Sequence, residues 1–109
     1  MAYLLRMGWH IEAHRFRLGH HDLDLIARLG SLVAFVEVKT RRSDRFGQGV
    51  EAVGRRKQAI MWRLAELWRL RFGLPGDRYR FDVISVWEGE SSTSPQVAHI
   101  EDAWRGVGK

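Results

Sequence analysis

The chain has 109 residues, which is enough for one domain with a modest hydrophobic core and too few for two. It contains no cysteine, which excludes disulfides and cysteine-bound zinc, and its net charge is +5. No apolar run approaches the roughly 20 residues of a membrane span, and the first residues lack the order of a signal peptide. We therefore expect a single domain over residues 1–109, located in the cytoplasm, with no membrane contact and with a basic balance suited to nucleic acid.

Hydrophobic patterning predicts the elements in chain order. The first eight residues are typical of the end of a helix that stops at Gly8. A second, longer helix is expected from about Glu51 to Phe72, where apolar residues recur at helical spacing. Strands are expected over residues 9–18, 21–29, 31–40, 78–87 and 96–100. The order α-β-β-β-α-β-β predicts an α/β fold, a mixed central sheet flanked by helices.

Residues 22–39 are expected to form a β-hairpin. Its turn lies in the sequence RLGS, where a two-residue loop with glycine first suits a type II′ turn, so opposed residues have numbers that sum to 61. In this register Asp24 opposes Glu37. Asp22 likewise opposes Lys39. Because strand side chains alternate between faces, all four ionisable groups are expected on one face of the sheet.

Two directly opposed carboxylates destabilise a sheet unless one takes up a proton or the pair holds a cation. A hard divalent ion suits such a pair, since Mg²⁺ binds one or two carboxylates together with water and phosphate. With Lys39 beside them, Asp24 and Glu37 indicate a metal-dependent site that cleaves phosphodiesters. The alternative is an exposed salt bridge between Asp22 and Lys39, with Asp24 and Glu37 solvated at a sheet edge. A one-residue slip in register would also separate the groups.

Two groups of cations lie close to this site in the sequence. The first follows the third strand and comprises Arg41, Arg42 and Arg45. The second lies in the first turns of the long helix and comprises Arg55, Arg56 and Lys57. Both groups are interpreted as contacts to nucleic-acid phosphates, the second because a helix N-terminus favours anions. A solvated run of charges is the alternative for the first group.

The spacing of Asp24 and the tripeptide Glu37-Val38-Lys39 resembles the PD-(D/E)xK nuclease signature. The segments DLDLIAR, LVAFVEVKTRR, EAV and YRFDVISV together resemble the YraN-like family of small uncharacterised bacterial proteins, UPF0102. The similarity runs from AYLLRMGW to HIEDAW. It implies a restriction-endonuclease-like core, related to archaeal Holliday-junction resolvases.

This resemblance implies roles for individual residues. The carboxylates of Asp24 and Glu37, with the backbone carbonyl of Val38, would bind Mg²⁺ or Mn²⁺. Lys39 would position the attacking water and steady the charge that develops on the phosphate.

Further residues enter through the same resemblance. Lys57 and Gln58 occupy positions where folds of this class place a helix residue next to the metal. Asp22 stands where the family commonly has glutamate, and it is expected as an accessory acid. The family usually begins with more of the first helix, including a glutamate, so the start of this protein is expected to lie upstream or the helix to be short.

Three functions remain open from the sequence. The first is a metal-dependent endonuclease that acts on DNA, structured or branched DNA in particular. The second is a nucleic-acid-binding module that keeps the nuclease fold without turnover. The third is a protein-interaction subunit, including a homodimer formed through an exposed strand or an apolar patch.

Overall fold

The computed structural model describes residues 2–41, 53–87 and 96–105, and these ranges follow the predicted order of elements. The elements are α1 (Ala2–Arg6), β1 (His10–Leu18), β2 (His21–Leu29), β3 (Leu32–Arg41), α2 (Arg55–Phe72), β4 (Arg78–Trp87) and β5 (Gln96–Trp104). The α/β class and the mixed sheet with helices are therefore confirmed for the described residues.

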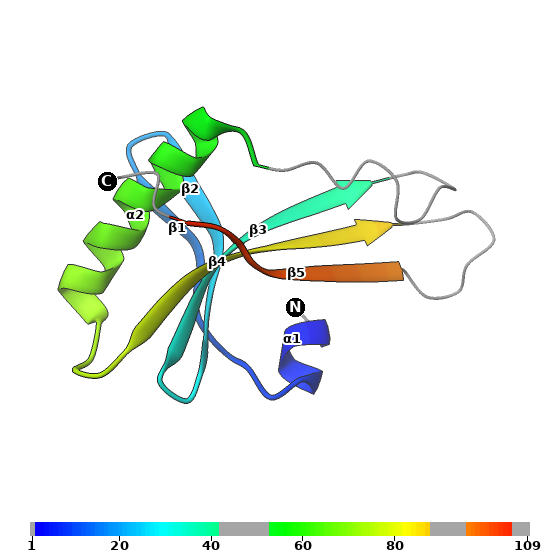
Figure 1. Ribbon diagram of the computed structural model, residues 1–109, viewed down its shortest axis with the longest axis horizontal. Helices are drawn as coiled ribbons and strands as arrows, with labels where there is room; N and C mark the ends of the chain where they lie inside the picture. Colours follow the sequence, from blue (N-terminus) through cyan, green and yellow to red (C-terminus); the bar gives the residue numbers. More distant parts are fainter. Residues whose placement is uncertain (1, 42–52, 88–95, 106–109) are drawn as a thin grey trace.

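The strands form a five-stranded sheet in the order β1-β2-β3-β4-β5 (Figure 1). Neighbouring strands are antiparallel except β3 and β4, which are parallel. A parallel pair requires a crossover connection, and α2 lies within the connection between these two strands. As a result, β3 is a central strand with neighbours on both edges, which explains its nearly continuous apolar sequence.

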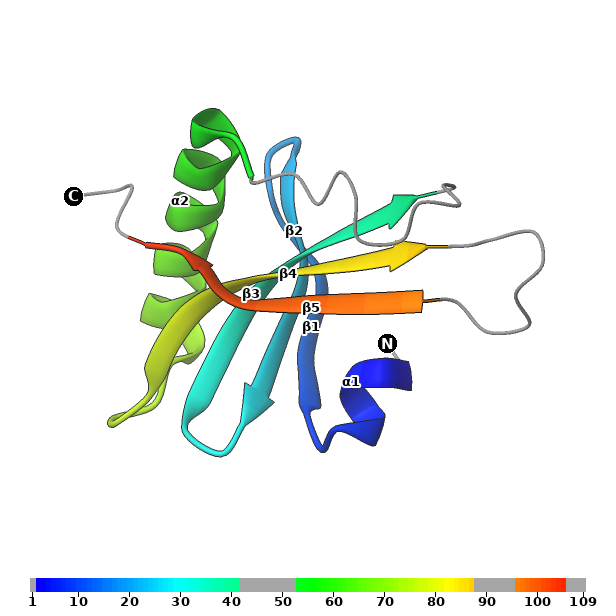
Figure 2. The ribbon, with the colours of Figure 1, turned by 45° about the vertical axis from the view of Figure 1, so that its right-hand side comes forward.

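The two helices cover opposite faces of the sheet (Figure 2). The face under α2 is packed with large apolar side chains, including Leu23, Ile26, Val33, Phe35, Met61, Leu64, Trp68, Phe81 and Val83. The face under α1 is packed with Leu4, Trp9, Leu25, Ala27, Ala34, Val36 and Ile84. Full burial of a side chain such as Phe35, which is 1% exposed, contributes about 1.5–3 kcal/mol to folding.

The turn between β2 and β3 has the predicted form. Gly30 has a positive φ of 63°, whereas Ser31 does not have a positive φ, which is the combination expected of a type II′ turn. Leu25 pairs with Val36 and Ile26 with Phe35, so the predicted register is confirmed along this part of the hairpin.

Two predicted boundaries are wrong. The long helix begins at Arg55 rather than Glu51, because the backbone of Gly54 is extended and Val53 lies outside the helix. The last strand continues to Trp104 instead of ending at residue 100, since an irregularity in pairing at the positive-φ residue Asp102 lets the strand resume its ladder. Neither helix that the structure describes is long and apolar enough to cross a membrane.

Candidate functional site

The hairpin brings Asp24 and Glu37 together at the point where the β2–β3 ladder ends. The last paired residues at this end are Leu25 and Val36. One position further on, Oδ2 of Asp24 accepts a hydrogen bond of 2.8 Å from the backbone N–H of Val38. The Asp24 side chain therefore replaces a backbone partner, and its carboxylate is fixed next to Glu37. We call Asp24 and Glu37 the acid pair.

This arrangement destabilises the charged form of Glu37. Its side chain is only 14% exposed, and its Oε1 atom is buried without a hydrogen bond to any other residue in the described ranges. Burial, and after it the negative charge of Asp24, raise the pKa of Glu37 above its ordinary value. A buried carboxylate oxygen without a hydrogen bond, next to a second carboxylate, is the environment that a bound cation would relieve.

Two lysines flank the acid pair. Nζ of Lys57, on α2, lies 3.7 Å from Oε1 of Glu37. Lys39 lies two residues beyond Glu37 on the same strand, and thus on the same face, but it forms no ion pair within the described part of the chain. Both cations act to lower the pKa of Glu37, Lys57 more strongly than Lys39. The helix lysine is therefore the nearer counter-charge.

The acid pair fits a hard divalent cation. Mg²⁺ and Mn²⁺ prefer oxygen ligands, and Mg²⁺ commonly binds one or two carboxylates with water completing its shell. Among the described residues no three His, Cys, Asp or Glu side chains gather around one point, so two carboxylates and a backbone oxygen such as that of Val38 are the available donors. A hollow of about 280 Å³ opens beside Asp24 and Val38, with His14, Arg15 and Leu25 as its other walls.

The predicted pairing of Asp22 with Lys39 is wrong. The Asp22 carboxylate lies 3.8 Å from Nε of Arg17 on β1. The β2–β3 pairing does not extend as far as Asp22, because the two strands part at the acid pair. Asp22 therefore belongs to the β1–β2 pairing, in which Arg17 is its direct partner.

The structure locates part of the predicted phosphate-binding set. Arg55 and Arg56 are exposed in the first turn of α2, whereas Lys57 faces the acid pair. Arg41 ends β3, but Arg42 and Arg45 lie outside the described residues.

Gln58 has a local partner at the start of α2. Its Nε2 donates a hydrogen bond of 2.6 Å to the backbone carbonyl of Val53, and its own backbone N–H donates to the carbonyl of Gly54. The side-chain amide thus fixes how the chain approaches the helix. Its predicted place next to a metal remains a prediction.

Ser85 is a neighbour of the site that the sequence did not single out. It pairs with Lys39 in the parallel β3–β4 ladder, so the two side chains share a face. The Ser85 side chain is fully buried, and its hydroxyl makes no hydrogen bond among the described residues. A lone serine within the apolar run of β4 was the available signal, but only the strand order shows that it adjoins Lys39.

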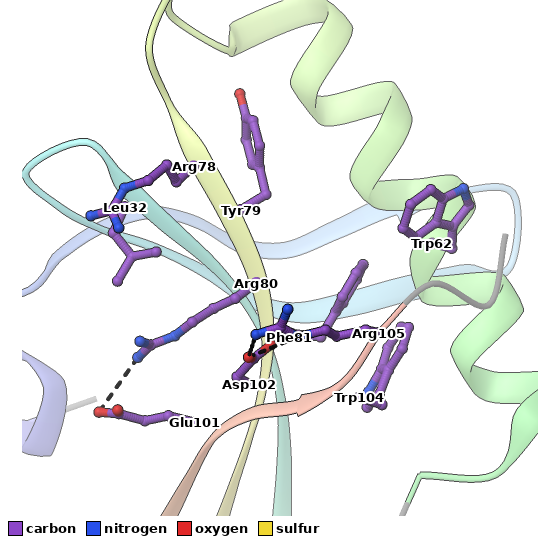
Figure 3. A pocket seen from close by; sticks show the side chains of 10 residues that line it. All are labelled: Leu32, Trp62, Arg78, Tyr79, Arg80, Phe81, Glu101, Asp102, Trp104 and Arg105. Carbon is purple, nitrogen blue, oxygen red and sulfur yellow. Dashed lines mark hydrogen bonds and ion pairs between the residues drawn. The ribbon is translucent and has the colours of Figure 1, made fainter. Parts of the chain in front are cut away.

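A larger hollow, of about 510 Å³, lies along β4 and β5 (Figure 3). Aromatic side chains such as Trp62, Tyr79 and Phe81 line it, together with arginines. Arg80 pairs with Glu101 at 3.5 Å, and Arg105 pairs with Asp102. Carboxylates therefore pair with two of the three arginines that line the hollow, and Arg78 is the third.

Fold and site together define an α/β protein in which a mixed sheet presents two adjoining carboxylates flanked by lysines. The chain belongs to the uncharacterised protein family UPF0102, whose model matches residues 1–86. A UPF0102 protein of Caldicellulosiruptor saccharolyticus is 41% identical over 104 residues, which cover 95% of this chain and 88% of the relative. A UPF0102 protein of Rhodococcus jostii is 38% identical over 102 residues, covering 94% of this chain and 86% of the relative.

Proposed function

We propose that this protein is a divalent-metal-dependent endonuclease with a restriction-endonuclease-like core, and that it hydrolyses phosphodiester bonds in structured or branched DNA. The single observation that carries the proposal is the buried Oε1 of Glu37, which has no hydrogen bond among the residues that the structure describes and adjoins the Asp24 carboxylate. The net charge of +5 and the lysines around the acid pair favour a polyanionic substrate.

Each residue of the site would have its own role in phosphodiester hydrolysis. Asp24 and Glu37, with the backbone carbonyl of Val38, would hold Mg²⁺ or Mn²⁺. The ion would supply Lewis-acid polarisation of the phosphate and lower the pKa of a bound water. Lys39 would donate hydrogen bonds to the phosphate oxygens as negative charge grows on them. The exposed Arg55 and Arg56 would contact neighbouring phosphates, which position the DNA without reading its sequence.

Cleavage of defined DNA substrates tests this function. Nicked, flapped and four-way DNA should be cut with MgCl₂ or MnCl₂ and left intact with EDTA. Glu37→Gln and Lys39→Ala should each lower the cleavage rate at least about 100-fold, the usual size for loss of one group that stabilises the transition state. Arg63→Met, on an exposed position of α2, is the matched control. Absence of cleavage of all three substrates with either ion would refute the enzymatic proposal.

A nucleic-acid-binding module without turnover is the second candidate. It is favoured by the small donor set, since among the described residues no three Asp, Glu, His or Cys side chains gather closely enough to hold one ion. Such a module should bind the same DNA with an affinity that falls steeply as salt rises, because binding releases counterions from the phosphates. Its affinity should survive Glu37→Gln unchanged, and no cleavage should accompany binding.

A further inference from the structure

Lys57 stands at a core-facing position of α2. The buried residues of this helix are Met61, Leu64, Ala65 and Trp68. Lys57 precedes Met61 by four residues, so it begins the same buried stripe. All the other members of the stripe are uncharged. An ammonium group at such a position needs a counter-charge, and Glu37 supplies it at 3.7 Å.

The start of α2 fixes where Lys57 points. Gly54 has an extended backbone, and the side chain of Gln58 is bound to the carbonyl of Val53. These contacts fix how the chain enters the first turn of α2, and that turn contacts the hairpin through Lys57 and Glu37. The ammonium lies 3.7 Å from the same buried oxygen, Oε1 of Glu37, that lacks a hydrogen bond within the described part of the chain and that a divalent ion would use.

An ammonium and a divalent cation cannot share that oxygen without strong repulsion. The Lys57 side chain is 38% exposed and has a flexible four-carbon stem, so it can move its charge into water when another cation arrives. We propose that Lys57 is a built-in competitor of the metal: its ammonium neutralises the acid pair when no ion is bound and is displaced when the ion binds.

This inference rests on the proposed function, because it assumes that the acid pair binds a divalent ion. It adds a form of regulation to that site. Since the competing charge must leave before the ion can bind, Lys57 sets the concentration of ion that the protein needs. The displaced ammonium of Lys57 then lies in solvent beside the acid pair, where it can contact a phosphate.

Calorimetric titration with MnCl₂ and MgCl₂, on the whole chain without DNA, tests the inference. Lys57→Met keeps the length and removes the charge, so it should bind either ion about 3- to 10-fold more tightly than the wild type, as loss of one half-exposed ion pair implies. Lys57→Arg should bind the ions more weakly than the wild type, because a guanidinium grips a carboxylate with two hydrogen bonds. Arg63→Met makes the same change of charge at an exposed position of α2 and should leave the affinity close to the wild-type value.

Thermal unfolding supplies a second readout. MnCl₂ should raise the Tm of Lys57→Met by more than it raises that of the wild type, because tighter binding to the folded state gives more stabilisation. If Lys57→Met does not fold, the weaker ion binding of Lys57→Arg decides the matter. Unchanged or weaker ion binding in Lys57→Met, or unchanged or tighter binding in Lys57→Arg, overturns the inference.

The outcomes also separate this inference from the proposed function. If ion affinity rises in Lys57→Met and falls in Lys57→Arg but no DNA is cut, Lys57 competes with the ion and the nuclease proposal fails. If ions bind to Lys57→Met but not to the wild type, the proposal that Lys57 competes with the ion is strongly supported. If neither the wild type nor Lys57→Met binds an ion, the inference is refuted.

Discussion

Oδ2 of Asp24 accepts a hydrogen bond of 2.8 Å from the backbone N–H of Val38, so a side chain of β2 completes the hydrogen bonding of β3 where the ladder ends. The bond gives Asp24 two roles. It satisfies a backbone donor, and it holds the carboxylate beside Glu37, where its charge contributes to the raised pKa of that residue. These roles can be separated by substitution, because an amide oxygen accepts the same bond without carrying a charge.

Asp24→Asn should keep the fold and lose the divalent ion. The amide can still accept from Val38, but the site has one negative charge fewer, so we expect the affinity for Mn²⁺ to fall at least about tenfold. Asp24→Ala should lose the ion as well, and it should also lower the free energy of unfolding by about 1–3 kcal/mol, because the Val38 N–H loses its partner. Calorimetry and chemical denaturation check the two effects. Wild-type ion affinity in Asp24→Asn would show that the acid pair is not the ion site.

Glu37→Gln should stabilise the protein in the presence of a chelator at pH 7. Burial, followed by the charge of Asp24, raises the pKa of Glu37 above its ordinary value of 4.5, so the folded state loses stability as the pH rises from 4.5 toward the raised value. The variant avoids this loss, and its Tm should exceed that of the wild type at pH 7 and approach it at pH 4.

The same variant should lose the response to metal. MgCl₂ should raise the Tm of the wild type, because the ion neutralises the acid pair and binds only the folded state. It should not raise the Tm of Glu37→Gln. A lower Tm for Glu37→Gln at pH 7 in chelator would mean that the Lys57 contact outweighs the cost of burying the charge.

The sequence predicted the acid pair because glycine in a two-residue turn fixes the hairpin register. Leu25 pairs with Val36 as the sum of 61 requires, and Asp24 and Glu37 are the next positions. The extension of the same sum to Asp22 and Lys39 failed. A count of residues assumes that the ladder continues, whereas the Asp24 carboxylate ends it by taking the Val38 N–H.

Other features depend on contacts that periodicity does not reveal. Apolar spacing located α2 but not its first residue, because the extended backbone of Gly54 sets that boundary. The burial of Ser85 beside Lys39 follows from the parallel pairing of β3 and β4, which joins segments more than forty residues apart in the sequence. The contact of Lys57 with Glu37 requires the packing of α2 on the sheet and was expected only through the family resemblance.

Asp77→Asn should flatten the acid dependence of stability. Arg28 donates two hydrogen bonds to the Asp77 carboxylate, at 2.7 and 2.9 Å, and this pairing lowers the pKa of Asp77 to about 2. A carboxyl with a lowered pKa stabilises the fold above its ordinary value of 3.8, and this stabilisation is lost as the pH falls toward 2. The variant lacks that contribution at every pH. Denaturation at pH 6, 4 and 2 should therefore show a smaller loss for the variant than for the wild type. Equal losses of stability in the wild type and the variant would show that Asp77 does not cause the acid dependence.

Asp82 forms the centre of a polar network on the face opposite the acid pair. It is fully buried and accepts hydrogen bonds from Arg80 at 2.9 Å, from the backbone N–H of Asp102 at 2.9 Å and, at 2.8 Å, from His99. The other ring nitrogen of His99 lies 3.2 Å from the Tyr3 hydroxyl, which joins α1 to the network. Burial alone would raise the pKa of Asp82, but these bonds together lower it.

Asp82→Asn should lower the free energy of unfolding by about 3–5 kcal/mol, the usual cost of removing one partner from a buried ion pair. The loss follows because Arg80, only 18% exposed, would keep its charge without the buried carboxylate. Glu101→Gln is the matched control. It removes the charge of the other carboxylate near Arg80. Because the Glu101 side chain is 61% exposed, the loss should cost less than about 1 kcal/mol. Because the network and the acid pair lie on opposite faces, Mn²⁺ affinity of the folded Asp82→Asn variant should equal that of the wild type. A reduced affinity would instead mean that α1 and the network support the acid pair through the sheet.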